Sequence, residues 1–247
     1  MTKICLVEGW HWFTIQEHTC PTFQYHPQEN PLVMTQMIQM TLDSLDLDAT
    51  MGLATSVAPY VDIFEVGTPC IKFNGLKIVE ALRAEFPNHK ILVDLKTMDA
   101  GEYEASPFYA AGADICTVLG VSGLATISGV VAAAKKHGGE VQVDLINVPN
   151  KTEVASQSVA VGADIIGVHT GLDAQAAGQT PFADLQEIAD LGLDVKISVA
   201  GGVNAGTAAQ VVQSGAKIVV VGAAIYSAGS PDQAAQEIRD AVFGTSV

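Results

Sequence analysis

The chain has 247 residues, and its 27 Asp and Glu against 12 Lys and Arg give a formal net charge of −15. So acidic a surface repels phosphodiester backbones and anionic lipid headgroups, and the scattered cations form no basic patch, which excludes nucleic acid and membrane surfaces as partners. Hydrophobic residues make up 49% of the chain, enough for a large core. No apolar run approaches the roughly 20 residues that cross a bilayer.

The four cysteines indicate a reducing compartment. Cys5, Cys20, Cys70 and Cys116 show no CxxC spacing. The N-terminus also lacks the basic stretch, apolar run and small-residue cleavage site of a secretory signal. We therefore expect a cytoplasmic protein with incidental thiols.

Composition changes sharply near residue 37, which predicts the one domain boundary. Residues 1–36 contain no Ala and one Gly but both Trp, and three prolines at 21, 27 and 31 interrupt them. We interpret residues 1–36 as an N-terminal extension of unknown role. Residues 37–247, rich in Ala, Gly and Val, are interpreted as a single catalytic domain.

Short β-branched apolar runs alternate with Ala-rich segments of helical spacing after residue 37. Their starts lie roughly 26 residues apart, the length of one strand, one helix and two short loops. Eight such units predict an α/β fold that closes into a (β/α)8 TIM barrel. The alternative is a doubly wound open sheet, which is less favoured because no GxGxxG follows the first strand. The runs are 38–42, 61–66, 91–95, 115–119, 141–146, 165–169, 195–199 and 218–221.

Ionisable residues gather at the C-terminal ends of these predicted strands, where barrel enzymes carry their chemistry. A buried carboxylate costs several kcal/mol unless it is paired, hydrogen-bonded or bound to a metal, so their repetition at one end favours a site. In chain order the residues are Asp43, Glu65, Asp94, Lys96, Asp99, Asp144, His169 and Asp173.

The densest cluster is the D-x-K-x-x-D segment that begins at Asp94. In a regular strand Asp94 and Lys96 point to the same face, so the carboxylate could ligate a divalent cation while the ammonium binds developing negative charge. Glu65 reaches the same centre, and two carboxylates with water suit Mg²⁺. The alternative is a salt bridge that only neutralises both charges. Asp43 and Asp144 could hold a substrate hydroxyl or only orient Lys96.

His169 is the only histidine at a predicted strand C-terminus. An imidazole there can remove and return a proton near neutral pH, although a lone histidine can also be no more than a hydrogen-bonded polar residue. Asp173 follows four residues later and is a candidate substrate ligand.

Phosphate recognition must come from backbone rather than arginine, because Arg83 and Arg239 both fall in predicted helices. The glycine-rich turns after the seventh and eighth strands offer N–H groups at helix N-termini, where barrels often bind phosphate. Tight turns without a ligand are the alternative. The candidate residues are Gly201, Gly202, Gly222 and Ala223.

Several segments resemble one known enzyme family. "VDIFEVGTP", "DLKTMDAGEYEA", "VHTGLDAQAAG" and "SVAGGV" are similar to 3-hexulose-6-phosphate synthase, in the orotidine-monophosphate-decarboxylase-like barrel suprafamily. The likeness runs from about residue 37 to the C-terminus. D-x-K-x-x-D alone marks only the suprafamily, whereas "DLKTMDAGE" together with "HTGLD" is more specific.

The resemblance implies a Mg²⁺-dependent aldol condensation of formaldehyde with the sugar phosphate D-ribulose 5-phosphate, giving D-arabino-hex-3-ulose 6-phosphate. Glu65 and Asp94 would be metal ligands, Lys96 would stabilise the enediolate, and His169 would abstract the C1 proton. Asp99 would reach the neighbouring subunit's site, so the family implies a homodimer.

The resemblance leaves two alternatives open. 3-Keto-L-gulonate-6-phosphate decarboxylase shares the scaffold, but that group typically has Arg where this chain has Leu172 and Ala223, and Glu in place of Asp144. These departures favour the synthase. The other alternative is a barrel that binds a sugar phosphate without turnover.

Overall fold

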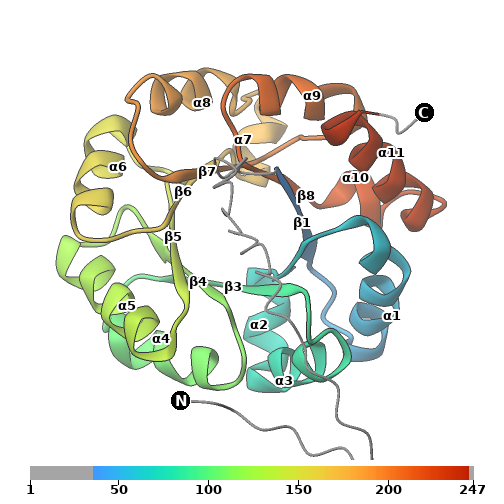
Figure 1. Cartoon of the computed structure of the whole chain (residues 1–247), viewed down its shortest axis with the longest axis horizontal. Coiled ribbons are helices and arrows are strands. Elements are labelled where there is room, and N and C mark those ends of the chain that lie inside the picture. Colours follow the sequence, from blue (N-terminus) through green and yellow to red (C-terminus); the bar gives the residue numbers. More distant parts are fainter. Residues whose placement is uncertain (1–35, 245–247) are drawn as a thin grey trace, which may run out of the picture. The chain divides into compact units, whose positions relative to one another are not determined.

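The computed structural model describes residues 36–244 of the chain. Its centre is a closed ring of eight parallel strands with helices around the outside (Figure 1). Each strand pairs with its neighbours in chain order, and β1 closes the ring by pairing with β8. The predicted (β/α)8 barrel is confirmed, and the open doubly wound sheet is wrong. The strands are β1 (Met37–Leu42), β2 (Ile63–Val66), β3 (Lys90–Thr97), β4 (Ile115–Leu119), β5 (Glu140–Asp144), β6 (Ile165–His169), β7 (Lys196–Ala200) and β8 (Ile218–Val221).

The helices pack their apolar faces against the ring and bury a continuous layer of aliphatic side chains. A 3₁₀ turn, η1 (Ala58–Tyr60), precedes β2. The helices are α1 (Leu47–Val57), α2 (Thr68–Asn74), α3 (Leu76–Glu85), α4 (Gly101–Ala110), α5 (Leu124–His137), α6 (Lys151–Ala160), α7 (Leu172–Ala176), α8 (Phe182–Ala189), α9 (Ala205–Gln213), α10 (Ala223–Tyr226) and α11 (Pro231–Phe243).

All eight expected strands are present, with shifts of one or two residues at some ends. One difference concerns β5, which stops at Asp144 instead of residue 146. There the Ile146 N–H donates to the Asp144 side chain at 2.9 Å, and Asn147 follows with φ +57°. This local turn leaves the sheet although Leu145 and Ile146 are apolar.

The barrel interior is built in layers of side chains from alternate strands. The lowest layer contains Lys90, Glu140 and Lys196, which form two ion pairs at the N-terminal ends of β3, β5 and β7. The next is a ring of four fully buried isoleucines, Ile63, Ile115, Ile165 and Ile218. Above the isoleucines most inward positions are polar, with Leu92 and Val220 as apolar exceptions, so the apolar ring seals the barrel beneath an open mouth.

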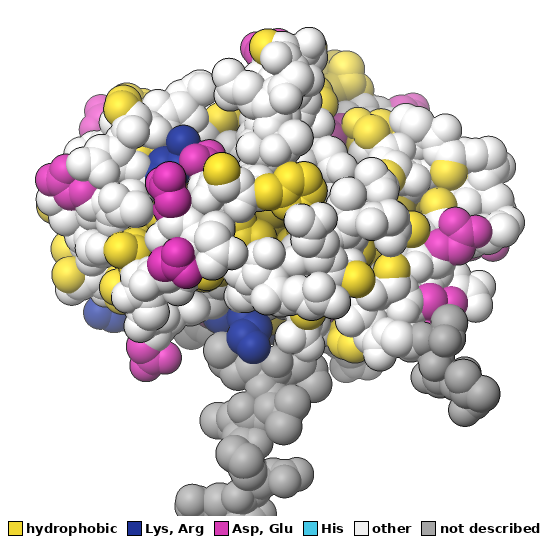
Figure 2. All heavy atoms as spheres, turned by 90° about the horizontal axis from the view of Figure 1, so that it is seen from above, with side chains coloured by type: hydrophobic (Ala, Val, Ile, Leu, Met, Phe, Trp, Pro, Cys, Tyr) yellow, Lys and Arg dark blue, Asp and Glu magenta, His cyan; other side chains and the backbone are white. Residues whose placement is uncertain are grey.

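The surface carries the expected acidic excess. On the side that Figure 2 shows, acidic side chains are scattered among neutral ones, with few lysines and arginines and no large basic patch. Among residues 36–244, no helix is both long and apolar enough to span a bilayer. The predicted extension, residues 1–36, lies outside the described residues except for Gln36, so the extension and its boundary stay predictions.

Candidate active site

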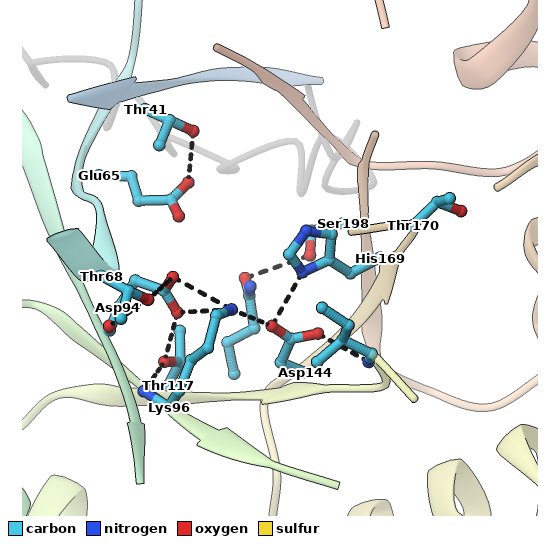
Figure 3. A network of polar contacts seen from close by, with 12 residues as sticks. Thr41, Glu65, Thr68, Asp94, Lys96, Thr117, Asp144, His169, Thr170 and Ser198 are labelled. Atoms are coloured by element: carbon cyan, nitrogen blue, oxygen red, sulfur yellow. Dashed lines mark hydrogen bonds and ion pairs between the residues drawn. The ribbon is translucent and has the colours of Figure 1, made fainter. Parts of the chain in front are cut away.

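A cavity of about 700 Å³ opens at the C-terminal ends of the strands. Its lining residues come from every strand except β4. The side chains of Glu65, Asp94, Lys96, Asp144 and His169 point toward the centre of the barrel mouth (Figure 3). The sequence-predicted residues that line it are Asp43, Glu65, Asp94, Lys96, Asp144, His169, Asp173, Gly201, Gly202, Gly222 and Ala223. The barrel therefore brings together all of the predicted site residues but Asp99.

Glu65, on β2, is a buried carboxylate that lines the cavity. Its Oε2 accepts hydrogen bonds from the Gln39 amide at 2.6 Å and the Thr41 hydroxyl at 2.9 Å, both from β1. Burial raises the pKa of Glu65, and the nearby charge of Asp94 raises it further, to about 7. These two carboxylates repel each other in a site that excludes much of the solvent.

Asp94, on β3, is held by hydroxyls on both sides. Thr68 donates to its Oδ2 at 2.6 Å and Thr117 donates to its Oδ1 at 2.8 Å. The Lys96 ammonium lies 3.1 Å from Oδ2. The side chain therefore has a fixed orientation with its negative charge directed into the cavity.

Lys96 does not continue the regular strand as the alternation predicts. The register of β3 against β4 shifts between Val93 and Thr97, and Lys96 has the left-handed φ of +47°. Its N–H donates to the Thr117 hydroxyl at 2.9 Å instead of a neighbouring strand carbonyl. A β-bulge of this kind re-aims a side chain, and it costs backbone strain in a non-glycine residue. The bulge directs the ammonium across the barrel to β5.

The Lys96 ammonium bridges two carboxylates. Its Nζ lies 2.5 Å from Asp144 Oδ2 and 3.1 Å from Asp94 Oδ2. Burial alone would lower the pKa of Lys96, but the charges of Asp94 and Asp144 outweigh burial and raise the pKa well above its ordinary value. This shift favours the charged form of Lys96, which suits binding an anionic oxygen.

Asp144 also orients the histidine. His169 Nδ1 lies 3.0 Å from Asp144 Oδ2, which leaves Nε2 as the ring nitrogen available to a ligand. Burial would raise the pKa of Asp144, but His169 and Lys96 lower it to about 2. Burial lowers the pKa of His169, whereas the hydrogen bond and charge of Asp144 outweigh burial and leave the pKa raised above 6.5.

The remaining acidic candidates occupy different positions. Asp43 lines the cavity after β1, and burial, followed by the charge of Asp94, raises its pKa. A side chain at Gly67 would overlap the Asp43 carboxylate, so this glycine lets Asp43 lie against the backbone after β2. Asp173 lines the cavity from α7. Asp99 is exposed after β3 and is not among the cavity-lining residues.

The two glycine-rich turns lie side by side at the cavity rim. Gly201 and Gly202 follow β7 with φ of +115° and +71°, and a side chain at Gly201 would overlap the Thr170 carbonyl. Gly222 precedes the short helix α10, whose first residue is Ala223. Among the described residues that line the cavity, Lys96 is the only Lys or Arg. An anion at this rim would therefore be bound by backbone N–H groups and neutral side chains.

Glu65 and Asp94 fit a magnesium ion. No group of three or more His, Cys, Asp or Glu among residues 36–244 could form a protein-only cage. Mg²⁺ does not need one, because it keeps several waters and binds through one or two carboxylates together with substrate oxygens. Burial and then the charge of Asp94 raise the pKa of Glu65, and a cation would offset both by stabilising the charged carboxylate.

Sequence reasoning missed the neutral polar residues of the site. Thr41, Thr68 and Thr117 hold the two carboxylates, and Gln142 and Ser198 lie inside the barrel below them. All of them except Thr68 occupy inward-facing positions on otherwise apolar strands, as Glu65, Asp94 and Asp144 do. Counting inward positions by twos along each strand could have found them.

Comparison with known proteins identifies the class. Residues 36–238 match the family described as orotidine 5'-phosphate decarboxylase / HUMPS. The chain therefore belongs to this family of barrel enzymes.

Individual relatives narrow the class. The 3-hexulose-6-phosphate synthase of Methylomonas aminofaciens is 63% identical over 202 residues, which cover 82% of this chain and 97% of that protein. The crystal structure of 3-hexulose-6-phosphate synthase from Salmonella typhimurium superposes with a TM-score of 0.81 at 37% identity, over 83% of this chain and 98% of that one. A crystal structure of KGPDC from Streptococcus mutans has a TM-score of 0.78 at 28% identity, over 85% of this chain and 97% of that one. Within the family, the chain belongs with the 3-hexulose-6-phosphate synthases.

Proposed function

We propose that the protein condenses formaldehyde with D-ribulose 5-phosphate to give D-arabino-hex-3-ulose 6-phosphate, with Mg²⁺ as cofactor. The observation that supports this chemistry is the row of contacts from Asp94 through Lys96 and Asp144 to His169, in which an ammonium and an oriented imidazole share one carboxylate. Such a pair suits removal of a proton beside a carbonyl and stabilisation of the resulting oxyanion. The relatives' name gives the product, a 3-hexulose 6-phosphate, and the two substrates are those that the family resemblance implies.

His169 is the base in this proposal. Its Nε2 takes the proton from C1 of the ketose, while Asp144 on Nδ1 fixes the tautomer and stabilises the imidazolium that forms. Lys96 donates hydrogen bonds to the oxygen on which negative charge develops, and this interaction is strongest when the charge is fully formed. When bound at Glu65 and Asp94, Mg²⁺ supplies a further positive charge that polarises the ketose oxygens.

The phosphate is proposed to bind at the rim between β7 and β8. Gly201, Gly202, Gly222 and Ala223 offer backbone donors that a bulky side chain would block. Asp43 and Asp173 then hold hydroxyls along the sugar chain. This orientation places the phosphate at the mouth and C1 toward Lys96 and His169.

A homodimer is part of the proposal. Asp99 is exposed beyond β3, and its side chain does not line the cavity of its own barrel. Two exposed apolar residues, Met98 and Tyr103, lie close to it in sequence. A second copy that covers this surface would bring Asp99 to the partner's site. From the cysteine pattern we propose a cytoplasmic location.

The alternative activity is decarboxylation of 3-keto-L-gulonate 6-phosphate, since the structural neighbour KGPDC, 3-keto-L-gulonate-6-phosphate decarboxylase, shares the barrel. Loss of CO₂ from that substrate would also leave an enediolate, which the Lys96 ammonium could stabilise in the same way. Leu172 and Ala223 at the rim, in place of arginines, favour the synthase.

A single assay tests these assignments. We expect purified protein to consume formaldehyde only with ribulose 5-phosphate present, to stop in EDTA, and to recover with Mg²⁺.

Lys96→Met should fold and lose turnover, whereas Lys136→Met, on the exposed face of α5, should match the wild type. Full activity in EDTA would contradict the metal assignment. Turnover of 3-keto-L-gulonate 6-phosphate without formaldehyde consumption would favour the decarboxylase.

A further inference from the structure

A polar floor lies inside the barrel, beneath the carboxylates of the site. Gln39 on β1, Gln142 on β5 and Ser198 on β7 occupy one layer, directly above the ring of isoleucines. All three are at least nine-tenths buried and all three line the cavity. Packing alone would favour aliphatic side chains at these positions, because buried polar groups are costly.

The floor has hydrogen-bonding capacity that the protein does not use. Gln39 Oε1 is buried with no partner among the described residues, although Gln39 Nε2 donates to Glu65. Ser198 donates to Gln142 Oε1 at 3.1 Å, while no described residue accepts from Gln142 Nε2. The floor therefore offers one free acceptor and one free donor. An unpaired buried acceptor is unfavourable and indicates a missing partner.

Space above the floor comes from Gly167 on β6. A side-chain methyl at this position would lie 3.1 Å from Gln142 Nε2 and 3.4 Å from Ser198 Oγ. Gly167 has no positive φ, so its backbone does not require glycine. Leaving this position empty opens the cavity down to the two polar side chains.

We infer that this floor, formed by Gln39, Gln142, Gly167 and Ser198, binds the one-carbon carbonyl substrate of the reaction. The inference rests on the proposed function and on the phosphate at the rim. Condensation lengthens the sugar at C1, the end opposite the phosphate, so the added carbon must lie deeper in the barrel than C1. The floor is the cavity-lining layer next to the isoleucine ring, and it offers one free donor and one free acceptor to a small carbonyl compound.

The two free groups match the change in that oxygen during the reaction. Gln142 Nε2 donates to the formaldehyde oxygen before attack. The enediolate electron pair forms the bond from C1 to the carbonyl carbon, C2 becomes a carbonyl again, and the C=O π pair moves onto the formaldehyde oxygen. That oxygen takes the proton that His169 removed from C1. The new hydroxyl then has a proton to donate to Gln39 Oε1.

Steady-state kinetics with each substrate varied separately test the floor. We expect Gln142→Met to raise KM for formaldehyde about tenfold, the size of one lost hydrogen bond, with KM for ribulose 5-phosphate within about twofold of wild type. Gly167→Ala, which fills the space, should raise the same constant. Gln157→Met on the exposed face of α6 and Gly52→Ala on α1, where a methyl meets no atom within 4 Å, are the matched controls and should change neither constant. Thermal melting of each variant checks that it folds.

The outcomes separate the two proposals. A selective rise in the formaldehyde constant for Gln142→Met or Gly167→Ala supports the floor. Equal changes in both substrates' constants, or no change in folded variants of an active enzyme, would overturn it while leaving the proposed function intact. Wild-type protein that consumes no formaldehyde with ribulose 5-phosphate would overturn both.

Discussion

Asp144 is the single residue on which most of the site depends. Its Oδ2 contacts both the Lys96 ammonium and His169 Nδ1, and its Oδ1 accepts the Ile146 N–H that ends β5. One side chain therefore fixes a cation, sets a histidine tautomer and shapes a loop. Because it is 3% exposed, its charge acts in a medium where electrostatic interactions are strong.

The pH dependence of the reaction follows from this carboxylate. A base must be neutral, so kcat/KM should fall as pH drops through the pKa of His169, which Asp144 raises above 6.5. In Asp144→Asn the charge of Asp144 is gone, while burial and Lys96 still lower the pKa of His169 and only the weaker effect of Asp94 raises it. We expect the acidic limb of the kcat/KM profile to move to lower pH by about one unit or more, together with reduced kcat.

The control is His137→Gln, a histidine on the exposed end of α5, which should keep the wild-type profile. His169→Gln should abolish the limb together with most activity. An acidic limb at unchanged pH in Asp144→Asn would show that another group is the base.

At the scale of elements, the sequence predicts regular structure well and irregular structure poorly. β-Branched runs at roughly 26-residue spacing predict all eight strands because a parallel strand covered on both sides must be apolar throughout. The bulge at Lys96 has no such signature, since Val93 to Thr97 reads as ordinary alternation and the left-handed φ falls on a lysine. The meeting of Lys96 with Asp144, 48 residues away, likewise follows from barrel closure and not from local pattern.

Helices α4 and α5 pack unusually closely, because glycines lie where they cross. A methyl on Gly101 would lie 2.2 Å from the Thr126 carbonyl oxygen and 2.8 Å from the Val130 nitrogen. On the other helix, a methyl on Gly129 would lie 3.0 Å from the Glu102 nitrogen. Backbone atoms cannot move aside as flexible side chains do, so the crossing depends on both glycines.

We expect Gly101→Ala to lower the free energy of unfolding by about 1–3 kcal/mol, the usual cost of overpacking. Urea denaturation of the purified protein measures it. Gly52→Ala, inside α1 with open space around it, is the matched control and should be neutral or stabilising by up to about 1 kcal/mol, since alanine favours helix. Equal midpoints for the two variants would show that α4 and α5 can separate at little cost.

At the scale of the whole molecule, the barrel holds two clusters of charged side chains, one at each end of its axis. The mouth holds Glu65, Asp94 and Asp144 around one lysine, and the base holds Lys90 and Lys196 around Glu140. The isoleucine ring lies between these two layers. An acidic chain thus has one lysine in the cavity, where the proposed anionic intermediate would form, and two lysines at the opposite end of the barrel.

The ion pairs at the base should stabilise the fold in a pH-dependent way. Burial raises the pKa of Glu140, but hydrogen bonds from Lys196 and Lys90 outweigh burial and hold the pKa below its ordinary value. A depressed pKa contributes stability that is fully present above the unfolded value near 4.5 and is lost as pH falls through the folded value.

Glu140→Gln should therefore cost about 1 kcal/mol of unfolding free energy from about pH 5 to pH 8, because the groups are only partly buried. The difference from wild type should shrink in more acidic urea titrations, whereas Glu187→Gln, exposed on α8, should show none at any pH. A difference that persisted unchanged at acid pH would mean that Glu140 stabilises the barrel by packing and not by charge.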